Sequence, residues 1–370
     1  MSRIAVVEGE ARSIVRFRGP LLQAARDAGH DVRVFGPSDE TTRAWLAAER
    51  IPFHELAARR GMISPGSDAG FALRLLGKLR QIRPDLLLTC TIKPTVYGIP
   101  VAALIGVPRR FALITGLGYA FTPGQPKLRR RIAAAAARIL YRTSLSRATA
   151  AIFQNLDDRQ EFQGSGLLGA APAYVVNGSG VDLDRFAAAA LPEEPRFLLI
   201  ARLLRDKGLA EYLAAASIVK AARPAARFDL VGSPDPNPSA FPLSQVQAAA
   251  DAGIIAYHGS VEDVRGLIAA ARVYVLPSYR EGTSRAVLEA MSMGRPIITT
   301  DAPGCRAPVS HGDNGLLVPV GSAEALAAAM IRLIDNPDDV TRMGARSRAI
   351  AEERYDVRLV TAEFMRILGL

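Results

Sequence analysis

The chain has 370 residues, which is too long for one ordinary hydrophobic core and predicts two domains. Its two cysteines and four histidines stand far apart, which argues against a disulfide framework or a zinc site, and 46 basic against 36 acidic residues give a net charge of +10. The sequence contains no run of 18 uncharged apolar residues and no secretory signal at its start, so we expect a cytoplasmic protein without a membrane span.

Short apolar runs alternate with helical stretches along the first half of the chain. We expect strands at residues 4–7, 32–35, 86–89, 111–115 and 150–154, and helices at residues 17–28, 71–82, 97–105 and 128–141. The strand runs are apolar throughout instead of alternating with polar residues. This is typical of parallel strands that are covered by helices on both faces of the sheet.

The basic excess is confined to one segment of the first half. Between Asp85 and Asp157 there is no acidic residue, and the 71 intervening positions hold ten bases, as many as the net charge of the whole chain. A local basic field of this kind predicts a polyanionic partner: nucleic acid, an anionic membrane or a diphosphate.

The second half repeats the pattern. We expect strands at residues 197–201, 228–231, 254–257, 273–276, 297–300 and 316–318, with helices between them, and a continuous helical stretch over residues 336–370. The prediction is an α/β fold with two Rossmann-like doubly wound domains facing across a cleft. We place the domains at residues 1–188 and 189–355, and expect a C-terminal helix at 356–370 to pack back on the first domain.

Two cations follow the first strand of the second domain. The stretch ARLLRDKGL begins at Ala201 and places Arg202 and Lys207 at the carboxyl end of that strand, where ligands bind in such folds. Two cations beside a helix N-terminus can bind a diphosphate, because the helix adds N–H groups and a positive dipole. The alternative is a pair of solvated loop cations.

Two glutamates follow a later strand of the same domain, in the stretch REGTSRAVLEAMSMGRP. On one helix, Glu281 and Glu289 would lie about 80° apart and share no face. With Ser284 as the N-cap, however, Glu281 lies in the loop and Glu289 just over one turn inside the helix. Two carboxylates at different depths could then bind two parts of a polyhydroxylated ligand. The alternative is an i,i+4 ion pair between Arg285 and Glu289, with Glu281 favouring the helix N-terminus.

Other common motifs are missing or unspecific. The first strand–helix junction lacks G-x-G-x-x-G, and the chain contains neither a P-loop nor a G-x-S-x-G elbow. Asp182 and Asp184 form a D-x-D, but that pattern is common, and we expect neither a metal nor another cofactor.

Read together and in this order, NGSGVDLDRF, ARLLRDKG and REGTSRAVLEAMSMGRPIITTDAPG resemble the retaining glycosyltransferases of family 4, which have the two-Rossmann (GT-B) architecture. That family carries an R-x4-K pair, here Arg202 and Lys207, and an E-x7-E pair, here Glu281 and Glu289. The resemblance covers essentially the whole chain. It implies a glycosyltransferase whose co-substrate is a nucleotide-sugar, with UDP as the expected nucleotide.

The resemblance also implies roles for individual residues. Glu289 would bind the ribose hydroxyls, Glu281 would contact the transferred sugar, and Arg202 and Lys207 would neutralise the leaving diphosphate, which stabilises the transition state. We therefore expect Glu281, Arg202 and Lys207 to be catalytic. We expect the following residues to bind the donor: Glu289, Gly282, Thr283, Ser284 and Val261.

TIKPTVYG, from Thr91, and ITGLGYAFT, from Ile114, resemble the capsule and N-glycan-pathway branch of the family. The branch implies a saccharide acceptor linked to undecaprenyl diphosphate at the inner face of the bacterial membrane. Many members carry a histidine in this region, whereas this sequence has only glycines and Tyr119. This difference argues against a histidine-based role, and no general base is evident. A front-face retaining mechanism, in which the leaving phosphate accepts the acceptor's proton, would need none.

The basic stretch from Pro126 to Arg147 mixes arginines with Leu128, Ile132, Ile139 and Leu140. As a helix it could lie on an anionic bilayer, where each base contributes about 1 kcal/mol. The alternative is an ordinary helix with a solvated basic face. We expect the following residues to serve the acceptor or the membrane: Lys93, Tyr119, Lys127, Arg129, Arg130 and Arg131.

Alternatives to this prediction remain open. A GT-B transferase could use a soluble acceptor or another lipid acceptor, and a nucleotide-sugar epimerase could share the architecture without any acceptor. Binding of nucleic acid is disfavoured, because no aromatic residues are interleaved with the bases and no known module is present.

Overall fold

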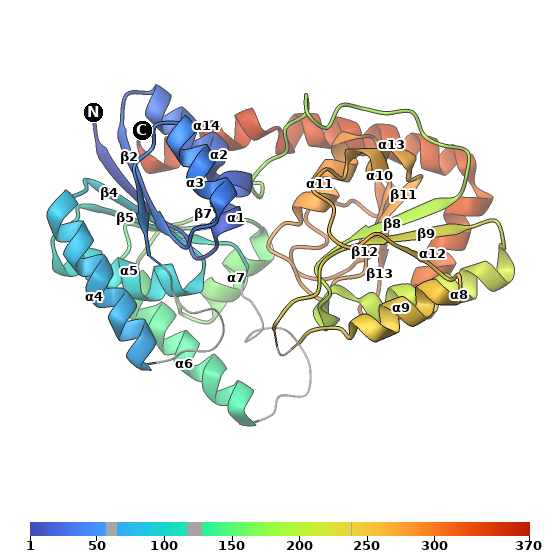
Figure 1. Cartoon of the computed structure of the whole chain (residues 1–370), viewed down its shortest axis with the longest axis horizontal. Helices are drawn as coiled ribbons and strands as arrows, with labels where there is room; N and C mark the ends of the chain where they lie inside the picture. Colours follow the sequence, from blue (N-terminus) through green and yellow to red (C-terminus); the bar gives the residue numbers. More distant parts are fainter. Residues whose placement is uncertain (57–64, 117–127, 238) are drawn as a thin grey trace. The chain divides into compact units, whose positions relative to one another are not determined.

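The computed structural model describes residues 1–56, 65–116, 128–237 and 239–370 of the chain. It divides into two compact units. The first contains Met1–Ser179 and Arg358–Leu370, and the second contains Gly180–Val357. Each unit is a parallel sheet with helices on both of its faces (Figure 1). The α/β prediction is therefore confirmed, with one doubly wound sheet in each unit.

The first sheet has the strand order β3-β2-β1-β4-β5-β6-β7. Its strands are β1 (Arg3–Val7), β2 (Asp31–Gly36), β3 (Phe53–Glu55), β4 (Leu86–Cys90), β5 (Arg109–Ile114), β6 (Ala150–Phe153) and β7 (Ala173–Val175). The sequence prediction missed β3 and β7, which are short edge strands without a long apolar run. The chain order reverses between β1 and β4, so ligands are expected beyond the carboxyl ends of these two strands.

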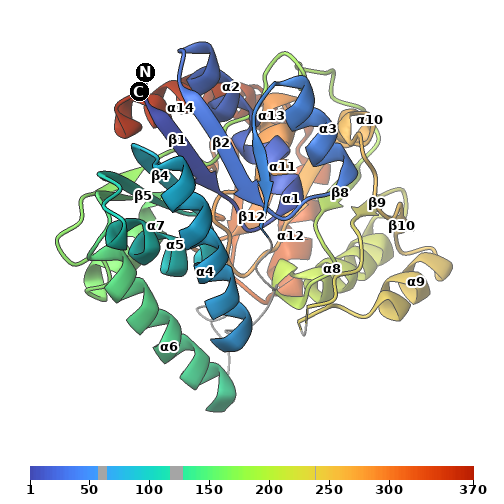
Figure 2. The ribbon, with the colours of Figure 1, turned by 60° about the vertical axis from the view of Figure 1, so that its left-hand side comes forward.

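Alternating residues of the first sheet face two separate cores. On β1, Ala5 and Val7 pack with the helices α4, α5, α6 and α7, whereas Ile4 and Val6 pack with α2, α3 and α14. The described helical segments are α1 (Ala11–Ser13), a π-helical turn (Ile14–Arg18), α2 (Gly19–Asp27), α3 (Glu40–Ala48), α4 (Pro65–Ile82), α5 (Ile92–Leu104), α6 (Leu128–Leu145), α7 (Leu156–Gly164) and α14 (Val357–Leu368). In both ribbon views α14 lies beside the N-terminal strand (Figures 1 and 2).

The second sheet has the strand order β10-β9-β8-β11-β12-β13. Its strands and the helices packed on it share one continuous hydrophobic core. Its strands are β8 (Arg196–Ile200), β9 (Arg227–Val231), β10 (Ala256–Tyr257), β11 (Val273–Leu276), β12 (Ile297–Thr300) and β13 (Gly315–Val318). The helical segments are a 3-10 turn (Arg205–Lys207), α8 (Leu209–Ala222), α9 (Leu243–Asp251), α10 (Arg265–Ala270), α11 (Arg285–Ser292), α12 (Ala323–Asp335), α13 (Pro337–Ile350) and a π-helical turn (Ala351–Tyr355). Every strand that the sequence predicted here is present.

The boundary between the units differs from the expected one between residues 188 and 189. It lies between Ser179 and Gly180, because Val181, Leu183 and Phe186 are buried in the core of the second unit. The chain crosses back at Val357, directly beside this point: the Val181 N–H donates to the Tyr355 carbonyl at 2.7 Å, and the Val357 N–H donates to the Val181 carbonyl at 2.9 Å.

The C-terminal stretch is not one continuous helix, as the sequence had suggested. Asp356 has the extended angles φ −54° and ψ 128° and separates the π-helical turn from α14. Beyond it, Val360, Phe364 and Leu368 are buried in the core of the first unit together with Ile4 and Val6. Residues 358–370 therefore belong to the first unit in space.

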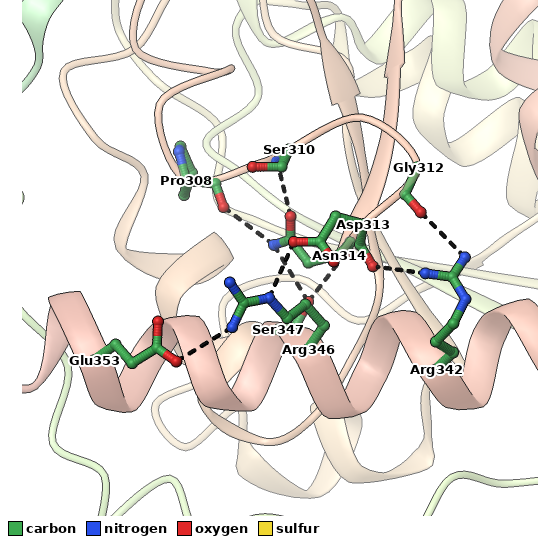
Figure 3. A network of polar contacts seen from close by, with 9 residues as sticks. All are labelled: Pro308, Ser310, Gly312, Asp313, Asn314, Arg342, Arg346, Ser347 and Glu353. Atoms are coloured by element: carbon green, nitrogen blue, oxygen red, sulfur yellow. Dashed lines mark hydrogen bonds and ion pairs between the residues drawn. The ribbon is translucent and has the colours of Figure 1, made fainter.

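A polar network anchors the segment between β12 and β13 to α13 (Figure 3). The buried Asn314 side chain accepts from the Ser310 N–H at 2.8 Å and donates to the Pro308 carbonyl at 3.1 Å. Ser347 of α13 donates to the Asn314 carbonyl at 3.0 Å, and the more exposed Arg346 pairs with Asp313 at 3.0 Å. The other end of the same segment contacts Glu281, one of the two candidate glutamates.

Candidate active site

The loop after β8 carries Arg202 and Lys207. A 3-10 turn at Arg205–Lys207 ends at Gly208, which has φ 71° and serves as the N-cap of α8. Glycine is required here, because an ideal Cβ at this position would lie 2.0 Å from the Pro277 carbonyl oxygen. The loop thus packs directly on the backbone that follows β11, the neighbouring strand, and the two cations lie at the carboxyl end of β8 as predicted.

The loop after β11 carries the two glutamates. Ser284 precedes α11 in an extended conformation and so occupies the predicted N-cap position, although its side chain makes no capping hydrogen bond. Glu281 lies in the loop and Glu289 in the second turn of the helix. The Glu281 N–H donates to the Pro303 carbonyl at 3.1 Å, and an ideal Cβ at Gly304 would lie 1.9 Å from the Glu281 carbonyl oxygen. The segment between β12 and β13 therefore supports this loop.

The two motifs meet in space. The Lys207 ammonium donates to the Glu281 carboxylate at 2.5 Å, and the two side chains are only 18% and 12% exposed. Burial raises the pKa of Tyr274 on β11, and the negative charges of Glu289 and Glu281 raise it further. One cation and two carboxylates are thus gathered at the carboxyl edge of the second sheet.

Glu289 also forms the ion pair that the alternative interpretation predicted. The Arg285 guanidinium donates to one Glu289 oxygen at 3.0 Å, one turn away on α11. Both side chains are mostly buried, at 22% and 14% exposed. The ion pair is compatible with a ligand-binding role for Glu289, because a carboxylate has two oxygens and can accept several hydrogen bonds.

The remaining predicted donor residues also follow the carboxyl ends of strands in the second sheet. Gly282 and Thr283 are partly exposed in the loop between Glu281 and Ser284. Val261 follows β10 and packs, partly buried, against the core of the second unit.

The sequence prediction missed two acidic residues near the two motif loops. Asp235 pairs with Arg202 at 2.7 Å, and Glu211 accepts a 2.7 Å hydrogen bond from the Tyr279 hydroxyl. Burial, together with this bond, raises the pKa of Tyr279 to about 12, so the phenol remains a neutral donor. Asp235 could have been found, because it follows β9, and the first two strands of a doubly wound domain are commonly neighbours in the sheet, as β8 and β9 are here.

In the first unit, a polar cluster lies where β4 ends. Lys93 and Tyr97, both on α5, donate to the buried Asp68 of α4 at 2.9 and 3.0 Å. Burial and the Asp68 carboxylate raise the pKa of Tyr97 to about 12. Thr91, just before α5, has φ 72°, which is a strained conformation for a β-branched residue. Lys93 is therefore held by a carboxylate and is not a freely solvated cation.

Two further acceptor-side predictions, Tyr119 and Lys127, fall outside the described residues. Arg129, Arg130 and Arg131 lie on α6, in the part for which only the backbone is described. Farther along α6, Ile139 is 65% exposed and Arg142 is exposed, whereas Leu140 packs partly against the core.

Some bases of the acid-free segment have structural roles. Arg109 donates to the carbonyl of Leu368 at 3.2 Å and to the Ser2 hydroxyl at 2.9 Å. Arg110 donates to the Arg147 carbonyl at 2.7 Å. These cations tie together chain segments of the first unit, so part of the segment's charge has a structural role.

The D-x-D residues have a local structural role. The Asp182 carboxylate accepts hydrogen bonds from the backbone N–H groups of Asp184 and Arg185, at 3.1 and 2.9 Å. Among the residues that the structure describes, no group of three His, Cys, Asp or Glu side chains could hold a metal ion. No described helix is long and apolar enough to cross a membrane.

A separate hollow of about 670 Å³ lies in the first unit, lined by residues such as Arg159, Leu168 and Pro172. It lies beside the start of β7, at the amino-terminal edge of the sheet. Ligands in doubly wound folds bind at the opposite edge, so we do not include this hollow in the active site.

Two family models match the chain. The model for a glycosyl transferase 4-like domain matches residues 14–180, and the model for glycosyl transferases group 1 matches residues 194–336. The two matches fall on the two structural units in turn.

Similar proteins include the N,N'-diacetylbacillosaminyl-diphospho-undecaprenol alpha-1,3-N-acetylgalactosaminyltransferase of Campylobacter jejuni, with 26% identity over 99% of this chain and 98% of the relative. The phosphatidyl-myo-inositol mannosyltransferase of Mycolicibacterium smegmatis is 33% identical over 51% of this chain and 50% of the relative.

Among solved structures, a sucrose-phosphate synthase from Thermosynechococcus elongatus aligns with a TM-score of 0.82 at 20% identity, covering 99% of this chain and 98% of the other. The Anabaena HepE protein in complex with UDP-glucose aligns over the whole of both chains with a TM-score of 0.79 at 19% identity. The fold predicted from the motifs is thus found in both neighbours. The chain belongs to the glycosyltransferases with the GT-B fold, with a glycosyl transferase 4-like domain followed by a group 1 domain.

Proposed function

We propose that this glycosyltransferase is a retaining enzyme that transfers one sugar from a nucleotide donor, with UDP as the nucleotide, to a saccharide linked to polyprenyl diphosphate. The observation that carries the donor half is the 2.5 Å ion pair between Lys207 and Glu281, which joins the two motifs in one site. The HepE structure with UDP-glucose supports the choice of nucleotide. The full-length similarity to the Campylobacter transferase supports the choice of acceptor, because the name of that enzyme specifies an undecaprenol-linked substrate.

The proposed chemistry follows from the charges of the site. Cleavage of the sugar–phosphate bond builds negative charge on the leaving diphosphate. Lys207 and Arg202 would stabilise that charge in the transition state, and Glu281 would hold both the lysine and the transferred sugar. The two cations could do so without a divalent metal ion. We therefore expect activity to survive EDTA, and strong dependence on added Mg²⁺ or Mn²⁺ would contradict this part of the proposal.

We place the enzyme at the inner face of the cytoplasmic membrane, where a lipid-linked acceptor would be found. Apolar side chains are exposed on two helices that cover the same face of the first sheet, Leu73 of α4 at 68% and Ile139 of α6 at 65%. Lys78 of α4 and Arg142 of α6 are also exposed. Apolar residues among cations are typical of a surface that contacts anionic lipid.

The first experiment is incubation of the purified protein with a panel of UDP-sugars, with and without a lipid-linked saccharide. We expect slow hydrolysis of one donor alone and faster consumption when the acceptor is present. The product should keep the anomeric configuration of the donor sugar, which NMR of the product would show. An inverted product would contradict the retaining mechanism, and isomerisation of the donor without transfer would indicate an epimerase.

A further inference from the structure

The segment after β9 packs along the diphosphate loop, the name used here for residues 201–208. The Leu203 N–H donates to the Ser233 carbonyl at 3.0 Å, and the Arg205 N–H donates to the Ser239 carbonyl at 2.9 Å. An ideal Cβ at Gly232 would lie 1.8 Å from the Ala201 carbonyl oxygen, so the two backbones are in direct contact. The backbone on both sides of Arg202 is therefore held by this neighbouring segment.

Asp235, in the same segment, holds the Arg202 side chain. One carboxylate oxygen accepts from the Asn237 N–H at 2.9 Å, and the other accepts from Nη1 of Arg202 at 2.7 Å. Asn237 in turn accepts from both the backbone N–H and the hydroxyl of Ser239, at 2.9 and 3.0 Å. Asp235 is 11% exposed and Arg202 is 54% exposed. The carboxylate is thus the fixed partner, and the guanidinium is the partner that a ligand can reach.

The contact with Asp235 involves only Nη1 of Arg202 and leaves the edge formed by Nε and Nη2 available to a ligand. An arginine presents Nε and Nη2 as a parallel pair of donors, which matches two oxygens of a phosphate. Asp235 uses Nη1, and the described residues supply no partner for Nε or Nη2 of Arg202. A long, half-exposed arginine otherwise loses rotamer freedom when it binds a ligand, and this loss weakens binding. An aspartate that already orients the guanidinium reduces that loss.

We propose that Asp235 is a positioning residue that orients Arg202 so that its Nε–Nη2 edge binds the diphosphate of the donor. The inference rests on the proposed function, in which Arg202 contacts that diphosphate. It requires that the aspartate stay on Nη1 while the phosphate binds the opposite edge. An aspartate that merely competed with the phosphate for the arginine would have the opposite effect on affinity.

Calorimetry with UDP and ligand-observed NMR with uridine, which lacks phosphates, test the proposal. Asp235→Ala should weaken UDP binding about three- to tenfold, the size expected for one charge-assisted hydrogen bond that is partly exposed. Asp235→Asn keeps an oxygen that Nη1 can reach and should stay within about twofold of the wild type. Uridine binding should not change in either variant. In an Arg202→Ala background, Asp235→Ala should have no further effect on UDP binding.

A matched control is Asp335→Ala, which removes another aspartate–arginine pair of the second unit, to Arg223, and should leave UDP binding unchanged. Unchanged or tighter UDP binding by Asp235→Ala would overturn the inference, as would an equal loss of uridine binding. In those cases the wild type would still bind UDP and the proposed function would stand. Failure of the wild type to bind any UDP-sugar or UDP would instead overturn the proposed function, and this inference with it.

Discussion

At the scale of single residues, the role of Glu289 has two competing explanations, because its ion pair with Arg285 is present in the structure. If Glu289 binds the ribose, Glu289→Ala leaves ribose hydroxyls without an acceptor and should weaken UDP binding by about 1–3 kcal/mol. Arg285→Ala removes the same ion pair but keeps the carboxylate, so it should leave UDP affinity nearly unchanged. Calorimetry of both variants separates the explanations. Equal UDP affinity for both variants and the wild type would show that the pair only supports α11.

Lys207 is expected to act on the leaving group. The charge of the diphosphate grows toward the transition state, so Lys207→Ala should reduce kcat more than it raises KM, with a loss in kcat of about 10²–10³-fold. Lys220→Ala removes a lysine of α8 that donates to the Gly253 carbonyl, away from the motif loops, and it should have no such effect. Steady-state kinetics with the identified donor measures both constants. A loss confined to KM would contradict a transition-state role.

At the scale of structural elements, the network between α13 and the segment that precedes β13 should contribute to stability. Asn314 is fully buried, so Asn314→Ala leaves the Ser310 N–H and the Pro308 carbonyl unpaired and should lower the free energy of unfolding by about 1–3 kcal/mol. Arg346→Ala removes an exposed ion pair of the same network and should cost about 0–1 kcal/mol. Urea titration of both variants compares them. Equal losses would mean that the buried amide is not the main anchor.

The helix α6 should serve the acceptor and not the donor, because the donor residues all belong to the second unit. Reversing the charges of Arg129, Arg130 and Arg131 together should release the protein from anionic liposomes and reduce transfer to a long-chain lipid acceptor. UDP binding should stay nearly unchanged. Liposome flotation and calorimetry measure the two effects. Binding of the wild type should fall as salt rises, because exposed charges are screened beyond about 8–10 Å.

A matched control for this variant reverses three exposed arginines of the second unit, Arg223, Arg227 and Arg332. It changes the net charge by the same amount but should not affect flotation. If the α6 variant floats like the wild type and turns over lipid acceptor normally, α6 is an ordinary helix with a solvated basic face.

The elements that sequence could predict were those with a strong local signal. The core strands were found because runs such as Leu86–Cys90 are apolar on both faces, and the loop positions of Arg202 and Glu281 followed from where such strands end. The edge strand Phe53–Glu55 has no such run and was missed. The predicted boundary between the units was misplaced, because Val181 and Phe186 lie in a stretch without strand or helix periodicity. Only tertiary packing shows that they belong to the core of the second unit.

The candidate site was also only partly predictable. The R-x4-K and E-x7-E motifs predicted four site residues, and the structure brings two of them, Lys207 and Glu281, into contact. The ion pair of Lys207 with Glu281 joins residues 74 positions apart, which no local pattern encodes. The same holds for the Asp235–Arg202 pair and for the support of Glu281 by Pro303 and Gly304. Partners of this kind follow from strand order, since the loops of neighbouring parallel strands meet at one edge of a sheet.

At the scale of the whole molecule, we propose that each unit binds one substrate. The second unit carries the four motif residues. The first carries exposed apolar and basic residues on α4 and α6, and the cluster of Asp68 with Lys93 and Tyr97. A transfer reaction needs both substrates bound together. The central claim is therefore tested by a complete reaction and not by the binding of either substrate alone.

The most direct measurement is mass spectrometry of the lipid product after incubation with a UDP-sugar and an undecaprenyl-diphosphate-linked saccharide. We predict that the mass of the lipid-linked saccharide increases by one sugar residue with one donor of the panel. Free UDP should appear in equal amount, and the Glu281→Gln variant should form far less product. If the saccharide gains no mass with any UDP-sugar while a soluble sugar acceptor is glycosylated, the proposed acceptor is wrong. If nucleotides other than UDP support the transfer and UDP-sugars do not, the proposed donor is wrong.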